Sequence, residues 1–361
     1  MHLGNLTAVA VSIYYPAQEH EYGGAIKRSR EGAAGRIGVR PLTTSTPAID
    51  QASTISTPVA LVVFNRPRLT EIVFSAIAQV RPSKLFVIAD GPRPGHASDI
   101  PKCVETRAII DRVDWPCEVL RNYSDVNLGC KMRPASGIDW VFSMVEDAIV
   151  LEDDCVPHPT FFRFCQELLE EYRHDQRLMM ISGTNLLGKW KSDQQSYHFS
   201  YHGGNWGWAS WRRAWQYFDV EMRLWAEPEV KARIRDVVAN PALYPSIETA
   251  FDAVHSGTMV DAWDYQWYFA RLLQSGLSVV PSVNLVSNIG FGEEASHTST
   301  AKSPIANLPV YPMSFPLKRP YGITDDRRFH ELCSLLPTRS LLQRISSLFR
   351  HILPGWPKAS T

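Results

Sequence analysis

The sequence predicts an α/β fold in which a mostly parallel central sheet is flanked by helices. Two observations support this fold class: short, strongly apolar segments alternate with segments of helical periodicity, and the apolar segments end in polar or Gly-rich residues. The order strand, helix, strand, helix, strand, helix, strand builds a parallel sheet through crossover connections. Because ligands bind outside the carboxyl ends of such strands, several polar loops are expected to meet at one edge of the sheet.

The expected elements begin near Thr57. The first is a strand at Val59–Phe64, which Asn65-Arg66-Pro67 terminates, and a helix at Leu69–Val80 follows it. The later elements, in chain order, are strands at Lys84–Ala89 and Glu118–Asn122, a helix at Pro134–Met144, a buried strand at Ala148–Leu151, an amphipathic helix at Phe161–Tyr172, and a helix from Asp264 to about Leu273.

Composition divides the chain into three parts. Residues 1–56 are rich in Gly, Ser, Thr, Ala and Pro without a sustained period, which predicts a disordered leader. Residues 57–300 carry the strand and helix patterns and form the expected main domain. Residues 301–361 form a C-terminal extension with a basic amphipathic helix at Leu341–Leu353, which is expected to dock on the domain, with weak membrane contact as the alternative.

The balance of charge excludes some classes of partner. The chain has 37 Lys and Arg against 37 Asp and Glu and is 45% apolar, which is typical of a soluble globular enzyme and does not favour a nucleic-acid partner. Its six cysteines lack regular spacing, so neither a zinc site nor a disulfide framework is expected. Neither a membrane-spanning segment nor an export signal is evident. We therefore expect a cytoplasmic protein, either free or peripheral to the inner face of a membrane.

Three consecutive acids, Glu152-Asp153-Asp154, directly follow the buried strand at Ala148–Leu151. Neighbouring carboxylates raise one another's pKa, and coordination of Mg²⁺ or Mn²⁺ by their oxygens removes that cost. Alternation along an extended segment would place Glu152 and Asp154 on one side and Asp153 on the other. The alternative is a solvated acidic turn in which Asp154 caps the helix that begins near Pro159.

Polar residues also follow the other expected strands, at Asn65-Arg66, Asp90 and Asn127–Gly129. A nucleotide-diphosphate sugar needs hydrogen bonds to its base, a carboxylate on its ribose, and a metal ion or basic side chains on its diphosphate. Together with the acidic triplet, these strand ends supply all three. Taken singly, Arg66 could be a surface residue and Asp90 an ordinary turn acid.

Seven tryptophans lie between residues 206 and 267, so this short part of the chain is unusually aromatic. Core packing accounts for most of them. Stacking against a sugar ring is the functional alternative, with Trp206, Trp208 and Trp263 as the candidates because they neighbour Gly or Asp.

Several segments carry a family resemblance. VALVVFNRPRL at Val59–Leu69, VIADGPR at Val87–Arg93, the stretch Lys131–Phe162 with AIVLEDDCVPHPTFF, and NWGWASWRRAW resemble nucleotide-sugar glycosyltransferases of the GT-A (Rossmann-like) fold. Among these, the pattern is most similar to the family of N-acetylglucosaminyltransferase I, the alpha-mannoside beta-1,2-N-acetylglucosaminyltransferase. The resemblance extends over about Thr57–Thr300 as scattered short motifs, and the Trp-rich half then lies on the acceptor side.

The resemblance implies roles for residues at the strand ends. Arg66 matches the family's nucleotide contact after the first strand, and Asp90 matches the acid that reaches the base. The triplet matches the Glu-Asp-Asp form of the DxD motif, which assigns Asp154 to the metal, Mn²⁺ or Mg²⁺, and Glu152 and Asp153 to the ribose and donor sugar. One carboxylate, diphosphate oxygens and waters can complete an octahedral shell around either ion.

Two further segments match the acceptor and loop regions of that family. The acidic, Trp-flanked segment from Asp261 to Trp267 resembles the one that supplies the general base, and Asp264 is the first candidate, with Asp261 the second. Asp264 could also cap its helix. His297 lies in a Gly-rich segment that is expected to close over the bound donor and to touch the diphosphate or the metal.

The sequence therefore predicts a metal-dependent, inverting glycosyltransferase of polysaccharide biosynthesis. It would transfer a sugar from a nucleotide-diphosphate donor to a hydroxyl of a carbohydrate or glycoconjugate acceptor. One alternative is a sugar-phosphate nucleotidyltransferase, although Asn65-Arg66-Pro67-Arg68 lacks the glycines of a phosphate-binding loop. The other is a non-catalytic carbohydrate-binding protein with a decayed site, which the intact acids do not favour.

Overall fold

The computed structural model describes residues 55–259, 263–291, 305–334 and 336. The strands of its main sheet are β1 (Val59–Val63), β2 (Lys84–Ala89), β3 (Glu118–Tyr123), β4 (Asp147–Glu152), β6 (Leu178–Ser182), β7 (Tyr197–Ser200), β8 (Trp208–Trp211) and β9 (Leu277–Pro281). A separate two-stranded sheet pairs β5 (Cys155–Pro157) with β10 (Val286–Asn288).

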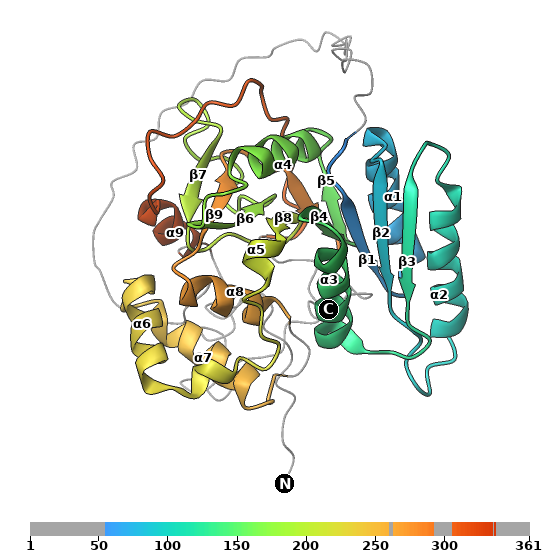
Figure 1. Ribbon diagram of the computed structural model, residues 1–361, viewed down its shortest axis with the longest axis horizontal. Coiled ribbons are helices and arrows are strands. Elements are labelled where there is room, and N and C mark those ends of the chain that lie inside the picture. Colours follow the sequence, from blue (N-terminus) through green and yellow to red (C-terminus); the bar gives the residue numbers. More distant parts are fainter. Residues whose placement is uncertain (1–54, 260–262, 292–304, 335, 337–361) are drawn as a thin grey trace, which may run out of the picture.

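The helices connect or follow these strands along the chain and lie outside the sheet (Figure 1). They are α1 (Pro67–Val80), α2 (Asp99–Ala108), α3 (Gly129–Met144), α4 (Thr160–Glu171), α5 (Arg212–Trp215), α6 (Pro228–Val238), α7 (Tyr244–His255), α8 (Asp264–Leu273) and α9 (Arg327–Ser334), with 3₁₀ helices η2 (Ile109–Arg112) and η3 (Arg223–Ala226). Within the described ranges, no helix is both long enough and apolar enough to cross a bilayer.

The order of the main sheet is β3-β2-β1-β4-β8-β6-β9-β7. β3, β2, β1 and β4 are parallel to one another, as the alternating pattern predicted. β8 is antiparallel to β4 and β6, β9 is parallel to β6, and β7 is antiparallel to β9. All strands except β8 and β7 therefore run in one direction, which confirms an α/β fold with a mostly parallel sheet.

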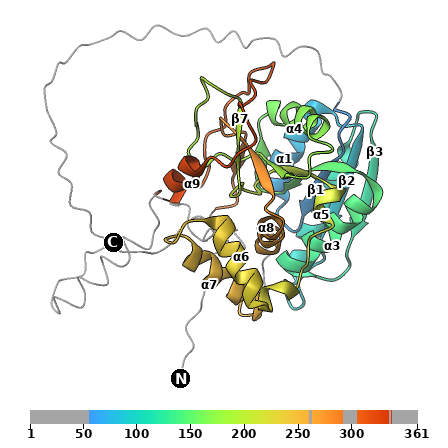
Figure 2. The same ribbon diagram turned by 60° about the vertical axis from the view of Figure 1, so that its left-hand side comes forward.

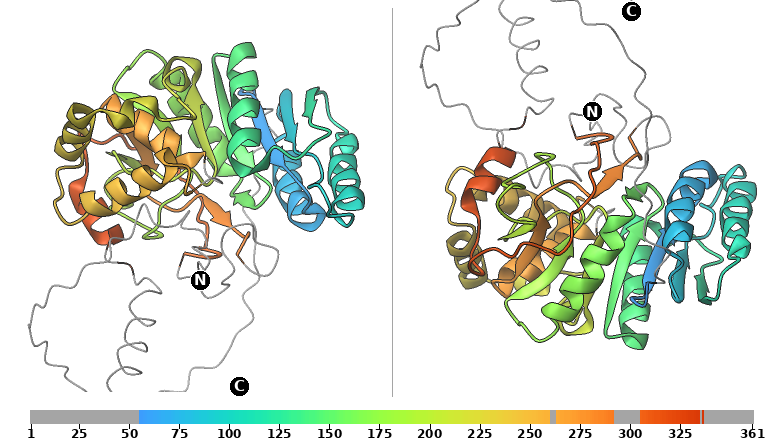
Figure 3. Two further views of the ribbon diagram at one scale, coloured as in Figure 1. Left: turned by 90° about the horizontal axis from the view of Figure 1, so that it is seen from below. Right: turned by 90° about the horizontal axis from the view of Figure 1, so that it is seen from above.

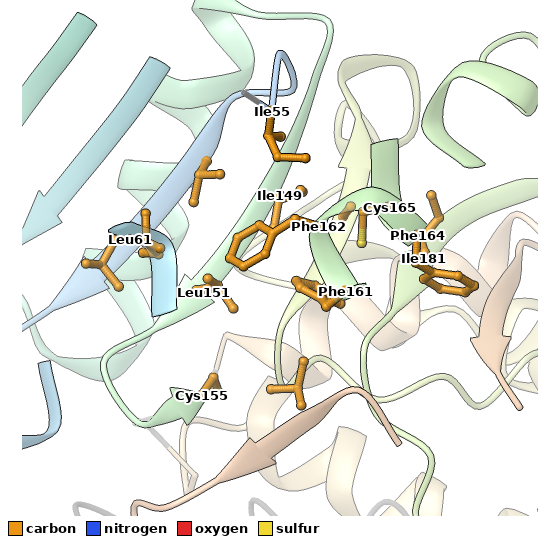
Figure 4. Close-up of a cluster of buried hydrophobic side chains, with 14 of the residues drawn as sticks. Ile55, Leu61, Ile149, Leu151, Cys155, Phe161, Phe162, Phe164, Cys165 and Ile181 are labelled. Atoms are coloured by element: carbon orange, nitrogen blue, oxygen red, sulfur yellow. The ribbon is translucent and has the colours of Figure 1, made fainter. Parts of the chain in front are cut away.

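The side chains of β1 alternate between two cores. Val59, Leu61 and Val63 face the core that α1 and α4 cover, whereas Ala60 and Val62 face the core covered by α3, α5 and α8. Both faces are buried, which explains why this strand is a continuous apolar run. In the first core, Phe161 and Phe162 of α4 lie against residues of β1 and β4 (Figure 4).

The start of α3 differs from the prediction. The helix begins at Gly129 rather than at Pro134, and Pro134 lies inside it. The carboxylate of Asp90, at the end of β2, accepts hydrogen bonds from the backbone N–H groups of Leu128 and Gly129 and so stabilises an earlier start. A contact between residues so far apart leaves no local signal in the sequence.

Core packing, the role expected for most of the tryptophans, is the role of Trp208 and Trp263, and the alternative of a sugar platform at these two positions is wrong. Their side chains are 1% and 5% exposed, and the two rings stack on each other with centroids 5.7 Å apart. Trp215 and Trp267 complete the cluster, so the ring faces are covered by other tryptophans. Trp206 is half-buried and packs edge-to-face on Phe291, so it alone of the three candidates keeps an exposed part.

β2 and β3 lie at one end of the molecule and α6 and α7 at the other (Figure 3). α6 and α7 pack on α8 through a core of their own that includes Trp225, Ile234, Phe251 and Phe269. α9 lies beside β7 (Figure 2), where Phe329 packs with Val280 of β9. Residues after the predicted domain boundary at 300 thus add to the core of the main sheet. The predicted leader, apart from residues 55 and 56, and the predicted helix at Leu341–Leu353 lie outside the described residues.

Candidate active site at the end of β4

Asp90 joins the end of β2 to the loop that follows β3. Its buried carboxylate accepts four hydrogen bonds of 2.8 to 2.9 Å, from the backbone N–H groups of Gly91, Leu128 and Gly129 and from the side-chain amide of Asn127. Four bonds fill the acceptor positions of a carboxylate. A direct bond to a nucleotide base would have to replace one of them, and the base-binding role of Asp90 stays a prediction.

A second carboxylate, Asp99 at the start of α2, joins the loops after β1 and β2. It accepts bonds of 2.7 Å from Asn65 Nδ2 and of 2.7 and 2.9 Å from Arg93 Nε and Nη2. These hydrogen bonds from Arg93 hold the pKa of Asp99 below its usual range despite the burial of the carboxyl group. The sequence did not single out Asp99, although an acid in the first turn of a helix after a Gly-Pro loop is a recognisable signal.

Arg66 lies between two acids of the triplet. Its Nε and Nη2 donate to the two oxygens of Asp153, with Nε at 3.2 Å, and its Nη1 lies 3.0 Å from Oδ2 of Asp154. The expected alternation within the triplet is therefore wrong, because β4 ends at Glu152 and the chain turns at Asp153 and Asp154 into β5. The turn brings both aspartates to one guanidinium group.

The alternative role of Asp154 as a helix cap is also wrong. α4 has no side-chain cap, and the N–H of Thr160 is bonded instead to the ring of His158. The acidic triplet is thus engaged by Arg66 rather than by the following helix.

The electrostatics of the triplet depend on burial and on this one arginine. Burial first, and then the charges of Asp154 and Asp153, raise the pKa of Glu152 to about 8, although Arg66 opposes the rise. Burial acts to lower the pKa of Arg66, but the carboxylates of Asp153 and Asp154 outweigh it and hold this pKa above its ordinary value. Arg66 therefore remains a cation.

Asp264 lies near the triplet, at the first residue of α8. Its negative charge contributes to the raised pKa of Glu152. As the pH rises, Asp264 loses its proton before Glu152 does, so Glu152 titrates beside an ionised Asp264. Burial raises the pKa of Asp264 to about 6, and the backbone N–H groups of Asp264 and Tyr265 oppose that rise. Trp263, not Asp264, holds the N-cap position of α8, and no side-chain cap bond forms there, so the predicted capping role of Asp264 is wrong. Its role as the base stays a prediction.

Gly290 lies directly against Asp154, because β10 pairs with β5 and brings the residues after it to the triplet. A Cβ at position 290 would lie 2.0 Å from Oδ2 of Asp154. The N–H of Ile289 donates to the carbonyl oxygen of Asp154 at 2.8 Å, and the N–H of Gly290 donates to Asn288 Oδ1 at the same distance. The start of the Gly-rich segment therefore forms one wall of the site and is held there by backbone hydrogen bonds. The other two predicted site residues, His297 and Asp261, lie outside the described residues.

The donor set has the chemistry that a hard divalent cation prefers, because the acids of the triplet offer only carboxylate oxygens. Among the described residues, no group of three or more His, Cys, Asp or Glu side chains is arranged to hold a metal ion. Instead, Arg66 contacts Oδ2 of Asp154, and the thiol of Cys155 lies 3.5 Å from Oδ1. The carboxylates at this edge are therefore ligands of the kind that a divalent cation prefers, and in this structure the guanidinium group of Arg66 supplies the positive charge next to Asp154.

Comparison of the chain with protein-family models and with curated proteins found no match. Its function is therefore inferred from the fold and from the side chains at this edge.

Proposed function

We propose that the protein is a metal-dependent glycosyltransferase with a GT-A arrangement, which transfers a sugar from a nucleotide-diphosphate donor to a hydroxyl of a carbohydrate or glycoconjugate. One observation carries the proposal: Arg66, the acids Glu152 to Asp154, and Asp264 come from three distant parts of the sequence and meet at the end of β4. The carboxyl edge of parallel strands is where ligands bind in such sheets.

Each side chain has a task in this reaction. Asp154 would hold Mn²⁺ or Mg²⁺, which when bound neutralises the charge that develops on the leaving diphosphate. Arg66 would contact the diphosphate, and Glu152 and Asp153 would position the ribose and the donor sugar. The three carboxylates of the triplet would therefore bind the metal and the donor, and the acceptor hydroxyl needs a different residue as its base.

Asp264 would take the proton from the attacking acceptor hydroxyl. With a pKa of about 6 it is ionised at neutral pH, and it is more basic than an ordinary aspartate. A base on a different element from the donor acids can face the acceptor while the donor lies on β4. Attack from that side displaces the diphosphate with inversion.

The nucleotidyltransferase alternative has less support. The connection between β1 and α1 consists of Phe64, Asn65 and Arg66 and contains no glycine. A phosphate-binding loop uses glycines to bring backbone N–H groups to the phosphates.

Calorimetric titration with UDP, GDP and dTDP, each with and without Mn²⁺, tests the proposal. Wild-type protein should bind at least one of these diphosphates in a Mn²⁺-dependent manner, and Asp154→Ala should lose that binding. Asp193→Ala is the matched control, because Asp193 is an exposed acid on the loop before β7. Absence of nucleotide binding by wild-type protein under every condition would refute the proposal.

A further inference from the structure

We propose that Arg66 holds the cation position at Asp154 in the nucleotide-free protein, so that the divalent ion enters together with the diphosphate. This inference rests on the proposed function and adds the order in which the same site is filled. It follows from how the atoms around Asp154 are arranged.

Asp154 is surrounded on several sides. Oδ2 faces Arg66 Nη1 at 3.0 Å and the backbone at Gly290, and Oδ1 faces the thiol of Cys155. The carbonyl oxygen of the same residue accepts the N–H of Ile289. Since β5, β10 and the wall at Gly290 are fixed by backbone pairing, the side chain of Arg66 is the neighbour that can move.

The contacts of Arg66 show how it can release Asp154 without leaving the site. Nε and Nη2 are both bonded to Asp153, whereas Nη1 alone reaches Asp154. A small rotation about the Asp153 pair would free Oδ2 of Asp154 and keep the guanidinium group anchored. The released Nη1 could then donate to a diphosphate oxygen.

Charge explains why the ion and the nucleotide should arrive together. A divalent ion at Oδ2 of Asp154 would lie beside Nη1 of Arg66, and the two positive charges repel each other. A diphosphate brings negative charges that both cations can share. Binding of the ion alone should therefore be weak, and binding of each partner should strengthen binding of the other.

Mn²⁺ binding measured by calorimetry, with and without saturating UDP or whichever diphosphate binds, tests this order. Wild-type protein should bind Mn²⁺ about 10- to 100-fold more tightly with the diphosphate than without it, within the usual range of coupling between sites. Arg66→Met removes the charge and keeps much of the length, and it should bind Mn²⁺ alone about 10-fold more tightly than wild type. Arg68→Met is the matched control, because Arg68 is an exposed arginine two residues further on and should change neither value.

The outcomes separate this inference from the proposed function. If wild-type protein binds Mn²⁺ equally tightly with and without the diphosphate, the inferred order is wrong while the glycosyltransferase proposal stands. If it binds no diphosphate at all, the proposed function itself fails. Arg66→Gln covers the case in which Arg66→Met does not fold: glutamine removes the charge and keeps an amide N–H that can donate to Asp153. Its affinity for Mn²⁺ alone should exceed that of wild type, and an unchanged affinity would overturn the inference.

Discussion

Replacing Gly290 with alanine should displace the metal-binding acid of the proposed site. The added Cβ would lie 2.0 Å from Oδ2, 2.7 Å from Cγ and 2.9 Å from Cβ of Asp154. Contacting heavy atoms settle at about 3.5 Å or more, so the carboxyl group and the backbone at position 290 must separate by about 1.5 Å. The side chain of Asp154 can yield only by giving up its 3.0 Å contact with Arg66.

Two magnitudes follow from this displacement. Overpacking of this kind costs about 1–3 kcal/mol of folding stability, which thermal or urea unfolding would measure. A misplacement of about 1 Å in a catalytic group can reduce turnover by about 100-fold, so the functional loss should exceed what the stability change explains. We expect Gly290→Ala to remain folded, to bind the diphosphate weakly in Mn²⁺, and to lose about 100-fold in kcat/KM.

Gly322→Ala is the control for this substitution. A Cβ at position 322 would have no atom within 4 Å, so stability and metal-dependent binding should stay at wild-type values. If Gly290→Ala binds Mn²⁺ and diphosphate as wild type does and turns over at the wild-type rate, the steric reasoning about Asp154 is wrong.

Three further predictions concern the base, the buried histidines, and the clamp that the Asp90 carboxylate forms on the loop after β3 through its four hydrogen bonds. Asp264→Asn should lower turnover by about 10²- to 10⁴-fold with donor affinity nearly unchanged, and the wild-type rate should rise with pH through about 6, a rise that is absent from the variant; equal rates would remove Asp264 as the base. Burial lowers the pKa of His198 and of His330 to about 4, so the unfolded chain binds more protons than the folded chain between about pH 4 and 6.5. Urea unfolding should show stability that is complete above about pH 6.5 and falls by about 2–3 kcal/mol per histidine toward pH 4. His198→Met should remove the contribution of that histidine and leave that of His330, and an unchanged slope would contradict this prediction. Asp90→Asn keeps only one oxygen for four donors and should cost about 1–3 kcal/mol in urea unfolding, whereas wild-type stability in this variant would show that the clamp contributes little.

The parallel strands β1, β2, β3 and β4 could be predicted from the sequence alone. β1, β2 and β4 each contain a buried apolar run that ends in polar residues, and such runs carry their own local signal, whereas β3 at the edge of the sheet has fewer apolar residues and is partly exposed. Side chains directly after these strands, such as Arg66 and the acids of the triplet, could be placed at one edge for the same reason. Asp264 was chosen because its acidic, Trp-flanked segment resembles the one that supplies the general base of a known family.

The remaining features depend on pairings that no short segment encodes. The antiparallel directions of β8 and β7 are set by packing of the whole sheet, since their segments are as fully buried as the parallel strands β1 and β6. The place of Gly290 depends on β10 pairing with β5, which lies far earlier in the chain. The alternation expected within the acidic triplet also failed, because the chain turns at Asp153 and both aspartates contact Arg66, which lies far away in the sequence.

The tryptophan cluster beside α8 gives the protein a built-in optical label. Trp263 directly precedes Asp264, and its ring stacks on Trp208, while Trp215 and Trp267 lie next to them. Indole rings this close exchange excitation energy, so their circular dichroism and fluorescence depend on their mutual orientation. A shift of the start of α8 would change those spectra without any added dye, which makes the position of the proposed base visible in solution.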